Sequence, residues 1–293
     1  MNDRSLTHAL PVIARTLMFF QRESRRGWLR IMVGDEPRVQ EARRAHLDFL
    51  ASQARLKNAE DSEQIVLDLR RNTTGMPTDA KADLETLLLA WVWLNKGIGY
   101  AQGMDMLAIV LRSHFVESNS PNPNHDTLAS LGFVCRVNAA FIPLHGSDPT
   151  PLHRATLFAS EVWLEVTCMN PTVGQHVTQI LDLLEIFAVK HLGVCFANLF
   201  NDKTILIVWD YLFKDGESTT RSKALAIAQR RSRHITSACI LEHRKLWILG
   251  RDTAQNFEIW QSVLRLADER TARHIVQVST HLETLETMGG EAR

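Results

Sequence analysis

Apolar residues recur at helical spacing through most of this 293-residue chain, and the strict alternation typical of β-strands is almost absent. The pattern predicts a helix from about Leu10 to Gly34 and an amphipathic helix over about 38–55. A short helix is predicted to follow, beginning with a capping box at Asp61 and Gln64 and ending at Arg71. The glycine and prolines that separate these segments disfavour continuation of each helix.

The middle of the chain contains its most apolar helices. Leu84–Leu94 is apolar on nearly every face, and Asp105–Phe115 is similar, so both are predicted to be deeply buried. A tight turn joins them. Two loops are predicted at 118–126 and 142–153, where proline, asparagine and other polar residues gather.

Helical periodicity continues to the end of the chain. Helices are predicted at about 157–168, 171–189, 193–200 and 204–213, followed by a polar loop over 214–222. The remainder is helical in pattern but much more polar. These elements predict an all-α protein that forms a single domain.

Composition excludes several classes of function. The chain is 45% hydrophobic and 23% charged with no net formal charge, so no overall field attracts nucleic acid or an anionic membrane. Three arginine clusters are interpreted as solvated helix faces: Arg22, Arg25, Arg26 and Arg30; Arg38, Arg43 and Arg44; Arg230, Arg231 and Arg233. The longest apolar run, Leu87–Leu94, is far shorter than the ~20 residues of a membrane span, which predicts no direct membrane insertion.

The cysteines and histidines predict no metal or redox site. The cysteines (Cys135, Cys168, Cys195 and Cys239) are far apart, as expected of a reduced intracellular protein. Twelve histidines include no close ligand cluster, and His274 and His281 are interpreted as part of a solvated stripe. No P-loop is present, so the chain is not expected to bind GTP by itself.

An arginine and a glutamine on neighbouring elements carry the first functional signal. Asp68 and Arg71 are three residues apart and can pair on one helix face, which alone indicates an ordinary surface ion pair. Arg71 is also the last residue before a cluster of helix breakers, which suits projection into a cleft, although Arg70 is an equal candidate.

The turn between the two apolar helices offers the second signal. Tyr100-Ala101-Gln102-Gly103 places a polar amide between buried segments, and that amide needs a partner inside or outside the fold. Gly103 permits backbone conformations closed to other residues, and Asp105 is suited to cap the following helix. A corner in which Gln102 satisfies loop carbonyls is an equal alternative. An arginine can stabilise a transferring phosphoryl group, and a glutamine can orient the attacking water.

Three ordered stretches resemble the motifs of the TBC-domain family of Rab GTPase-activating proteins. Residues 65–71, IVLDLRR, are similar to the family's I-x-x-D-x-x-R motif, and GIGYAQGMD at 97–105 is similar to its GYCQGM-N segment. Residues 196–216, FANLFNDKTILIVWDYLFKDG, resemble a third motif, W-F-x-x-L-F followed by I-W-D and a glycine. The early GWLRIMVG at 27–34 is similar to the family's opening W-x-x-L-L-G.

The resemblance implies an all-α, two-lobed, V-shaped fold with an N-terminal lobe over 1–180 and a C-terminal lobe over 181–293. It also implies the role of each site residue. Arg71 would be an arginine finger and Gln102 would position the attacking water. The remaining residues would hold the fingers, contact the partner or brace the lobe interface: Asp68, Tyr100, Gly103, Asp105, Trp209 and Asp210.

The chain departs from the family pattern in three places. Cys195 stands where the third motif usually has tryptophan, and Asp105 stands where asparagine is usual. Between Phe200 and Trp209 the chain is several residues short. Beyond Gly216 polar sequence replaces the expected apolar helices, which predicts a remodelled C-terminal lobe.

The sequence therefore predicts a protein that accelerates GTP hydrolysis by a GTP-bound, Rab-like small GTPase. The partner would supply GTP and Mg²⁺, and the chain would hold no cofactor or metal of its own and would not be an enzyme by itself. It is expected to be cytoplasmic and to reach endomembranes in vesicle traffic through its partner. The alternative is a catalytically weak or inactive module of the same fold that binds GTPases or other proteins as a scaffold.

Overall fold

The computed structural model describes residues 47–95, 99–120, 123–137, 150–214, 221–249 and 253–291, and within these ranges it contains helices and no β-strand. The helix predicted at 10–34, the start of the next helix and the first two arginine clusters lie outside the described residues. In chain order the helices are α3 (Leu47–Lys57), α4 (Ala59–Asn72), α5 (Thr78–Leu94), α6 (Met104–Glu117), α7 (Pro123–Val137), α8 (Thr150–Met169), α9 (Pro171–Val177), α10 (Leu181–Phe187), α11 (Asp202–Phe213), α12 (Arg221–Glu242), α13 (Arg244–Leu249), α14 (Thr253–Arg265) and α15 (Glu269–Glu291).

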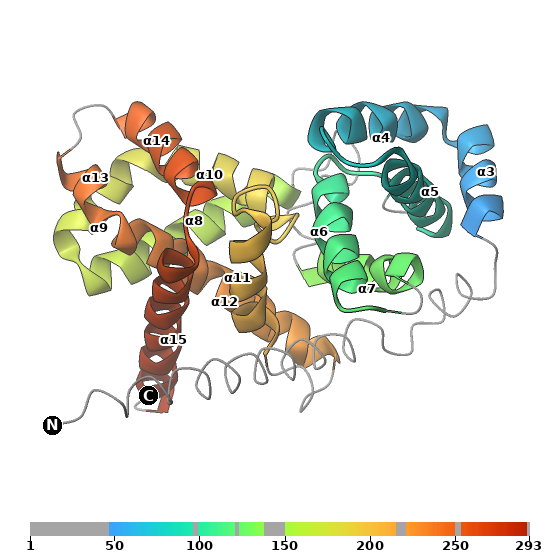
Figure 1. Cartoon of the computed structure of the whole chain (residues 1–293). Helices are drawn as coiled ribbons and strands as arrows, with labels where there is room; N and C mark the ends of the chain where they lie inside the picture. Colours follow the sequence, from blue (N-terminus) through green and yellow to red (C-terminus); the bar gives the residue numbers. More distant parts are fainter. Residues whose placement is uncertain are drawn as a thin grey trace, which may run out of the picture.

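The helices form two groups, α3–α7 and α8–α15, that lie side by side (Figure 1). We call them the N-terminal and C-terminal lobes. The lobe boundary expected at residue 180 stays a prediction; in the structure α8 and α9 pack with α10, α12 and α13 in the second group. Both lobes consist of helices around apolar cores, as an all-α fold requires.

Helix α5 is the centre of the N-terminal lobe, where it packs against α3, α4, α6 and α7. Leu84, Leu87, Leu88 and Leu89 are almost completely buried, which confirms the prediction for this segment. The helix begins earlier than predicted, at Thr78. The predicted capping box is wrong, because α4 begins at Ala59 and its N-cap makes no side-chain hydrogen bond.

The chain between α9 and α11 is less regular than the sequence predicts. The helix expected over 171–189 is divided into α9, a 3₁₀ turn (Thr178–Ile180), α10 and a π-helical turn (Ala188–Leu192). The helix predicted at 193–200 is wrong, because Cys195 and Phe196 have φ angles of 45° and 66°, which a helix cannot accommodate. We call residues 193–201 the wedge segment.

Two tertiary contacts hold the wedge segment. The Trp209 indole of α11 is fully buried and donates to the Cys195 carbonyl at 2.8 Å. The Cys195 thiol points the other way and lies 3.7 Å from the Val134 carbonyl of α7, in the N-terminal lobe. The wedge segment thus connects the core of one lobe with the other.

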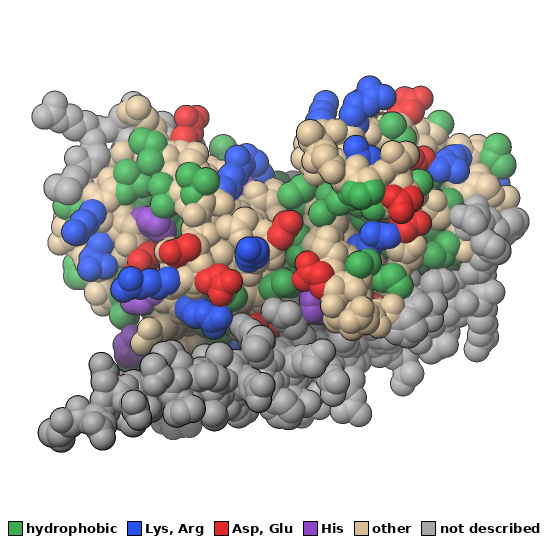
Figure 2. All heavy atoms as spheres, in the orientation of Figure 1, with side chains coloured by type: hydrophobic (Ala, Val, Ile, Leu, Met, Phe, Trp, Pro, Cys, Tyr) green, Lys and Arg blue, Asp and Glu red, His purple; other side chains and the backbone are tan. Residues whose placement is uncertain are grey.

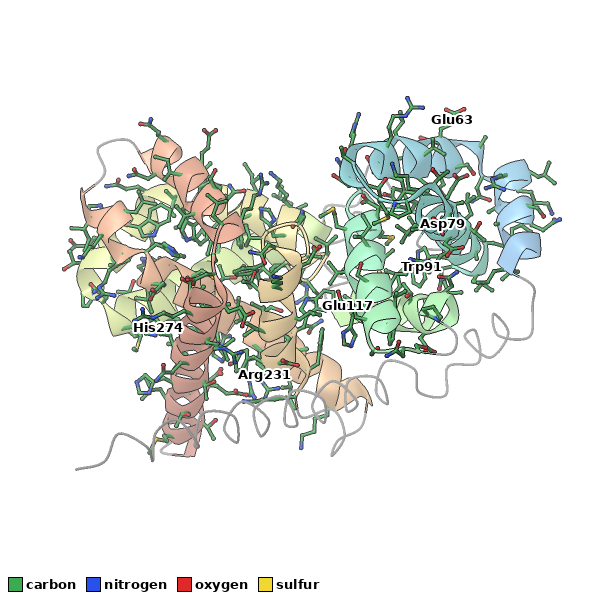
Figure 3. The ribbon with its side chains drawn as sticks, viewed as in Figure 1. Glu63, Asp79, Trp91, Glu117, Arg231 and His274 are labelled. Atoms are coloured by element: carbon green, nitrogen blue, oxygen red, sulfur yellow. The ribbon has the colours of Figure 1, made fainter. Side chains whose placement is uncertain are left out.

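The polar C-terminal third is held by buried charge. Arg231 of α12 is 2% exposed, and its Nε donates to Glu283 of α15 at 3.0 Å (Figure 3 shows Arg231 beside α15). Arg233 contacts Glu165 of α8 and Glu286 of α15. The interpretation of this arginine cluster as a solvated face is therefore wrong for Arg231 and Arg233, because their partner carboxylates come from helices distant in sequence.

The predicted boundaries also differ at two loops, since α7 already begins at Pro123 and α8 at Thr150. Helix α11, predicted at 204–213, is confirmed and begins at Asp202 with Asn201 as its N-cap. No helix of the described part of the chain is long and apolar enough to cross a membrane.

Candidate functional site

A cleft of about 1110 Å³ lies between the two lobes. Its first wall comes from the end of α4, the turn at 100–103 and the start of α6, and its second wall comes from α10, the wedge segment and the end of α14. Figure 2 shows the notch between the two lobes. Arg71 and Gln102 both line this cleft, so the two residues that the sequence singled out share one opening.

Arg71 lies in the last turn of α4 and its side chain is 65% exposed. Its Nη1 is 3.5 Å from Oδ1 of Asp68, a carboxylate that is itself 3% exposed. This pair is long for an ion pair, so it orients the guanidinium without neutralising its donors. Arg70 is also exposed but does not line the cleft, and the structure thereby separates the two arginine candidates.

Gln102 is exposed on the turn that connects α5 with α6. Gly99 and Gly103 flank this turn with φ angles of 65° and 96°, which only glycine adopts readily. The buried Trp91 indole of α5 donates to the Gly99 carbonyl at 3.1 Å. The backbone on either side of Gln102 is therefore fixed while its side chain remains free to extend into the cleft.

A polar network beneath the cleft joins the elements that carry Arg71 and Gln102. The Tyr100 hydroxyl lies 3.0 Å from Asp68 Oδ2 and 3.3 Å from Asp105 Oδ1. Asn72 Nδ2 donates to Asp105 Oδ2 at 2.6 Å, and Gln64 Nε2 donates to Asp68 Oδ1 at 3.0 Å. Helix α4, the turn and helix α6 are thus tied together through two buried aspartates, Asp68 and Asp105.

Burial controls the protonation of this network. Burial, followed by the charges of Asp105 and Asp68, raises the pKa of the Tyr100 hydroxyl far above its usual value. Burial also raises the pKa of Asp105, the hydrogen bond from Asn72 opposes that rise, and the charge of Asp68 adds to it. Tyr100 is therefore a neutral hydrogen-bond donor throughout the physiological pH range.

The second wall of the cleft combines apolar and charged side chains. Ile186 of α10 is 60% exposed, and Lys190, Asn198 and Arg265 also line this wall. Behind it, His191 lies 2.7 Å from Asn198 Oδ1. Glu185 and Asp202 line the same wall, which therefore offers hydrophobic contact beside charges of both signs to whatever enters the cleft.

The geometry can be compared with known proteins. The family model of the Rab-GTPase-TBC domain matches residues 28–236, which is most of the chain. The chain belongs to this family. A crystal structure of a Chlamydomonas flagellar RabGAP TBC domain is similar in fold, with a TM-score of 0.55 and 14% sequence identity. The alignment covers 96% of this chain and 91% of that one. No curated protein sequence matches.

The family match and the similar crystal structure confirm the predicted all-α TBC fold class and the resemblance to this family. Members of this family act on partner GTPases. The structure places four of the other predicted site residues beside Arg71 and Gln102. These four line the cleft with the two finger candidates: Asp68, Tyr100, Gly103 and Asp105.

At Gly103, the last residue of the turn, the two lobes lie in close contact. A side chain at this residue would place its Cβ 2.8 Å from Cγ1 of Val194 in the wedge segment. Trp209 and Asp210 do not line the cleft. Trp209 instead holds the wedge segment against α11, through its hydrogen bond to the Cys195 carbonyl.

Sequence reasoning missed two members of the polar network beneath the cleft, Gln64 and Asn72. Gln64 is four residues before Asp68 on α4, a spacing that was available in the sequence. Asn72 appeared to belong to the helix-breaking stretch, but α4 extends to it and directs its amide at Asp105. Among the described residues, no group of three or more histidine, cysteine or acidic side chains could hold a metal ion.

Proposed function

We propose that this TBC domain accelerates GTP hydrolysis by a GTP-bound, Rab-like small GTPase, with Arg71 and Gln102 inserted into the partner's nucleotide site. The observation that carries the proposal is that both side chains line one cleft, and that hydrogen bonds among Asp68, Tyr100 and Asp105 join the elements that carry them. GTP and Mg²⁺ would come with the partner, and the complete catalytic site would exist in the complex alone.

Arg71 would stabilise the charge that develops on the γ-phosphoryl group as it transfers. Its side chain is already mostly exposed, so it can enter a neighbouring pocket with little rearrangement. A guanidinium that is excluded from water in such an interface can contribute about 10³–10⁵ to the rate. Asp68, which contacts Arg71 on one side and Tyr100 on the other, would aim the guanidinium.

Gln102 would position the water that attacks the phosphoryl group. A carboxamide can accept a hydrogen bond from that water and donate another to a phosphate oxygen or a backbone carbonyl. The turn that carries it is anchored by Trp91 and Tyr100, so Gln102 would meet the partner in a defined place. Precise placement of an attacking group is a large part of catalysis by orientation.

The protein would reach membranes through its partner. Its described residues include no helix that is both long and apolar enough to cross a membrane, whereas Rab-like partners would bring their own attachment. We therefore propose a cytoplasmic protein that is peripheral to endomembranes while it engages its GTPase. Selectivity among GTPases would depend on side chains around the fingers, including Ile186 and Lys190 of the second wall.

Phosphate release from a panel of GTP-loaded Rab proteins tests the proposal. The wild-type chain should accelerate release by at least one panel member. Arg71→Ala and Gln102→Ala should each lower that acceleration by two or more orders of magnitude, and Arg71→Lys should restore little of it because lysine lacks the planar fork of donors. Arg70→Ala is the matched control, since it removes the same charge from the adjacent exposed position.

Full acceleration by the Arg71 and Gln102 variants would contradict the proposal. A second candidate, a binding module without activating power, has one observation in its favour: the wedge segment carries Cys195 in an irregular turn where the family motif usually has tryptophan. Saturable binding of a GTP-bound Rab without faster hydrolysis would support that alternative.

A further inference from the structure

The hydrogen bonds around Tyr100 cannot all form if both neighbouring carboxyl groups are ionised. The tyrosine hydroxyl carries one proton, yet it lies within 3.3 Å of oxygens from both Asp68 and Asp105. If Tyr100 donates to one carboxylate, its oxygen can only accept from the other. A proton on one of the two aspartates would allow both contacts to be hydrogen bonds.

Asp68 meets hydrogen-bond donors on both of its oxygens. It accepts from Gln64 on one oxygen and from Tyr100 on the other, and it faces the Arg71 guanidinium at 3.5 Å. Asp68 is therefore the acceptor of the Tyr100 proton.

Asp105 is suited to carry the second proton. It is completely buried at the start of α6, and its near neighbours are the Asn72 amide, the Tyr100 hydroxyl, the Met106 backbone and the negative charge of Asp68. Arg71 contacts Asp68 and makes no hydrogen bond to Asp105 within the described network. Ionisation of Asp105 would bury a second negative charge beside the first.

We propose that Asp105 is a protonated positioning residue, whose carboxyl O–H donates to the Tyr100 oxygen and thereby holds the turn that carries Gln102. The proposal rests on the proposed function for its activity readout. In this state the hydrogen bonds form a continuous chain: Asp105 donates to Tyr100, Tyr100 donates to Asp68, and the second oxygen of Asp105 accepts from Asn72. Asp105, Tyr100, Asn72 and Gln64 then each donate to an acceptor within the network.

Loss of the Asp105 proton to solvent would break this chain of hydrogen bonds. Tyr100 could still donate to Asp68, but its oxygen would then face an anionic oxygen 3.3 Å away with no proton between them. Repulsion would displace Tyr100, and Gln102 lies two residues along the same turn. Activation of the partner should therefore weaken as the pH rises through the pKa of Asp105, which burial raises.

Asp105→Asn provides the direct test, because an asparagine amide donates toward Tyr100 and accepts from Asn72 whatever the pH. The measurement is single-turnover GTP hydrolysis by a responsive Rab across a pH series, each rate divided by that of the Rab alone. The wild-type ratio should fall by up to tenfold per pH unit above the pKa of Asp105. The Asp105→Asn ratio should lack that alkaline fall.

Asp79→Asn is the matched control, since it removes an exposed carboxylate from the first turn of α5 (Figure 3) and should follow the wild-type profile. Parallel profiles for the wild type and Asp105→Asn would overturn the proposal. So would an alkaline fall that Asp79→Asn removes as fully as Asp105→Asn does.

Infrared spectroscopy supplies a readout that does not need the partner. At pH values where exposed carboxyl groups are ionised, the wild-type protein should retain the C=O stretching band of one protonated carboxylic acid. That band should disappear as the pH rises and should be missing from Asp105→Asn. If the variant does not fold, the band can still be titrated in the wild type, and its absence there would overturn the inference. Failure of the finger variants to alter hydrolysis would instead refute the proposed function and leave the infrared result standing.

Discussion

Gly103→Ala should be the most damaging small substitution in the turn, because two separate costs meet at this residue. The φ angle of 96° places an alanine in the left-handed region, at a cost of about 1–2 kcal/mol. Its Cβ would also lie 2.8 Å from Cγ1 of Val194, which is 5% exposed and has little room to move. Overpacking of this kind costs about 1–3 kcal/mol. The free energy of unfolding should therefore fall by about 2–5 kcal/mol, a large part of the ~5–15 kcal/mol typical of a native protein.

The Gly75→Ala variant isolates the cost of placing an alanine in the left-handed backbone region. Gly75 has a φ angle of 83°, but a Cβ there would meet nothing within 4 Å. The free energies of unfolding of the two variants, measured in urea, should therefore differ only by the cost of the contact with Val194, about 1–3 kcal/mol. In a double-mutant cycle, Val194→Ala should return most of that difference to Gly103→Ala, because it removes the γ-carbon that the new methyl group would meet.

An equal loss of stability in Gly103→Ala and Gly75→Ala would refute this reasoning. So would additive effects of Gly103→Ala and Val194→Ala. Either result would mean that the wedge segment does not press against the turn that carries Gln102, and that the two lobes are not coupled at this place.

Three further predictions concern the C-terminal lobe. Burial lowers the pKa of His191 from 6.5 to about 4, so the unfolded state binds a proton at a higher pH than the folded state does. The wild type should therefore lose about 3 kcal/mol of stability between pH 6.5 and 4, and urea titrations of His191→Gln should lack that loss. Glu283→Gln should lower the free energy of unfolding by about 3 kcal/mol because it leaves Arg231 buried without its ionised partner, whereas replacing both residues with Met should cost much less in the same assay. Trp209→Phe should cost about 1–3 kcal/mol in thermal unfolding because the buried Cys195 carbonyl loses its donor, and partner activation should fall with it.

The local pattern of apolar residues and helix breakers was sufficient to predict the elements that carry Arg71 and Gln102. Leu84–Leu94 and Asp105–Phe115 are so uniformly apolar that their burial was predicted, whereas the sequence left open whether Gln102 in the turn between them would face loop carbonyls or the cleft. The end of α4 at Asn72, next to Arg71, followed from glycine and proline nearby. Helical spacing and chain breakers are local properties, and the sequence displays them directly.

Tertiary contacts explain what the sequence could not show. Arg231 looked solvent-exposed because its partner, Glu283, lies on another helix 52 residues away. The wedge segment looked helical because its composition is apolar, but the hydrogen bond from Trp209 and packing against the N-terminal lobe stabilise positive φ angles at Cys195 and Phe196. The second wall of the cleft was missed for the same reason, since its residues share no motif.

The most direct test of the central claim is complex formation on a transition-state analogue. Aluminium fluoride bound beside GDP mimics the transferring phosphoryl group, and such analogues favour complexes whose groups contact the transition state. The wild-type chain should bind a responsive Rab carrying GDP and aluminium fluoride at least a hundredfold more tightly than the same Rab with GDP alone. Arg71→Ala and Gln102→Ala should each lose most of that gain, while Arg70→Ala keeps it. Equal affinity of the wild type for the two nucleotide states would contradict the claim that Arg71 and Gln102 complete the partner's active site.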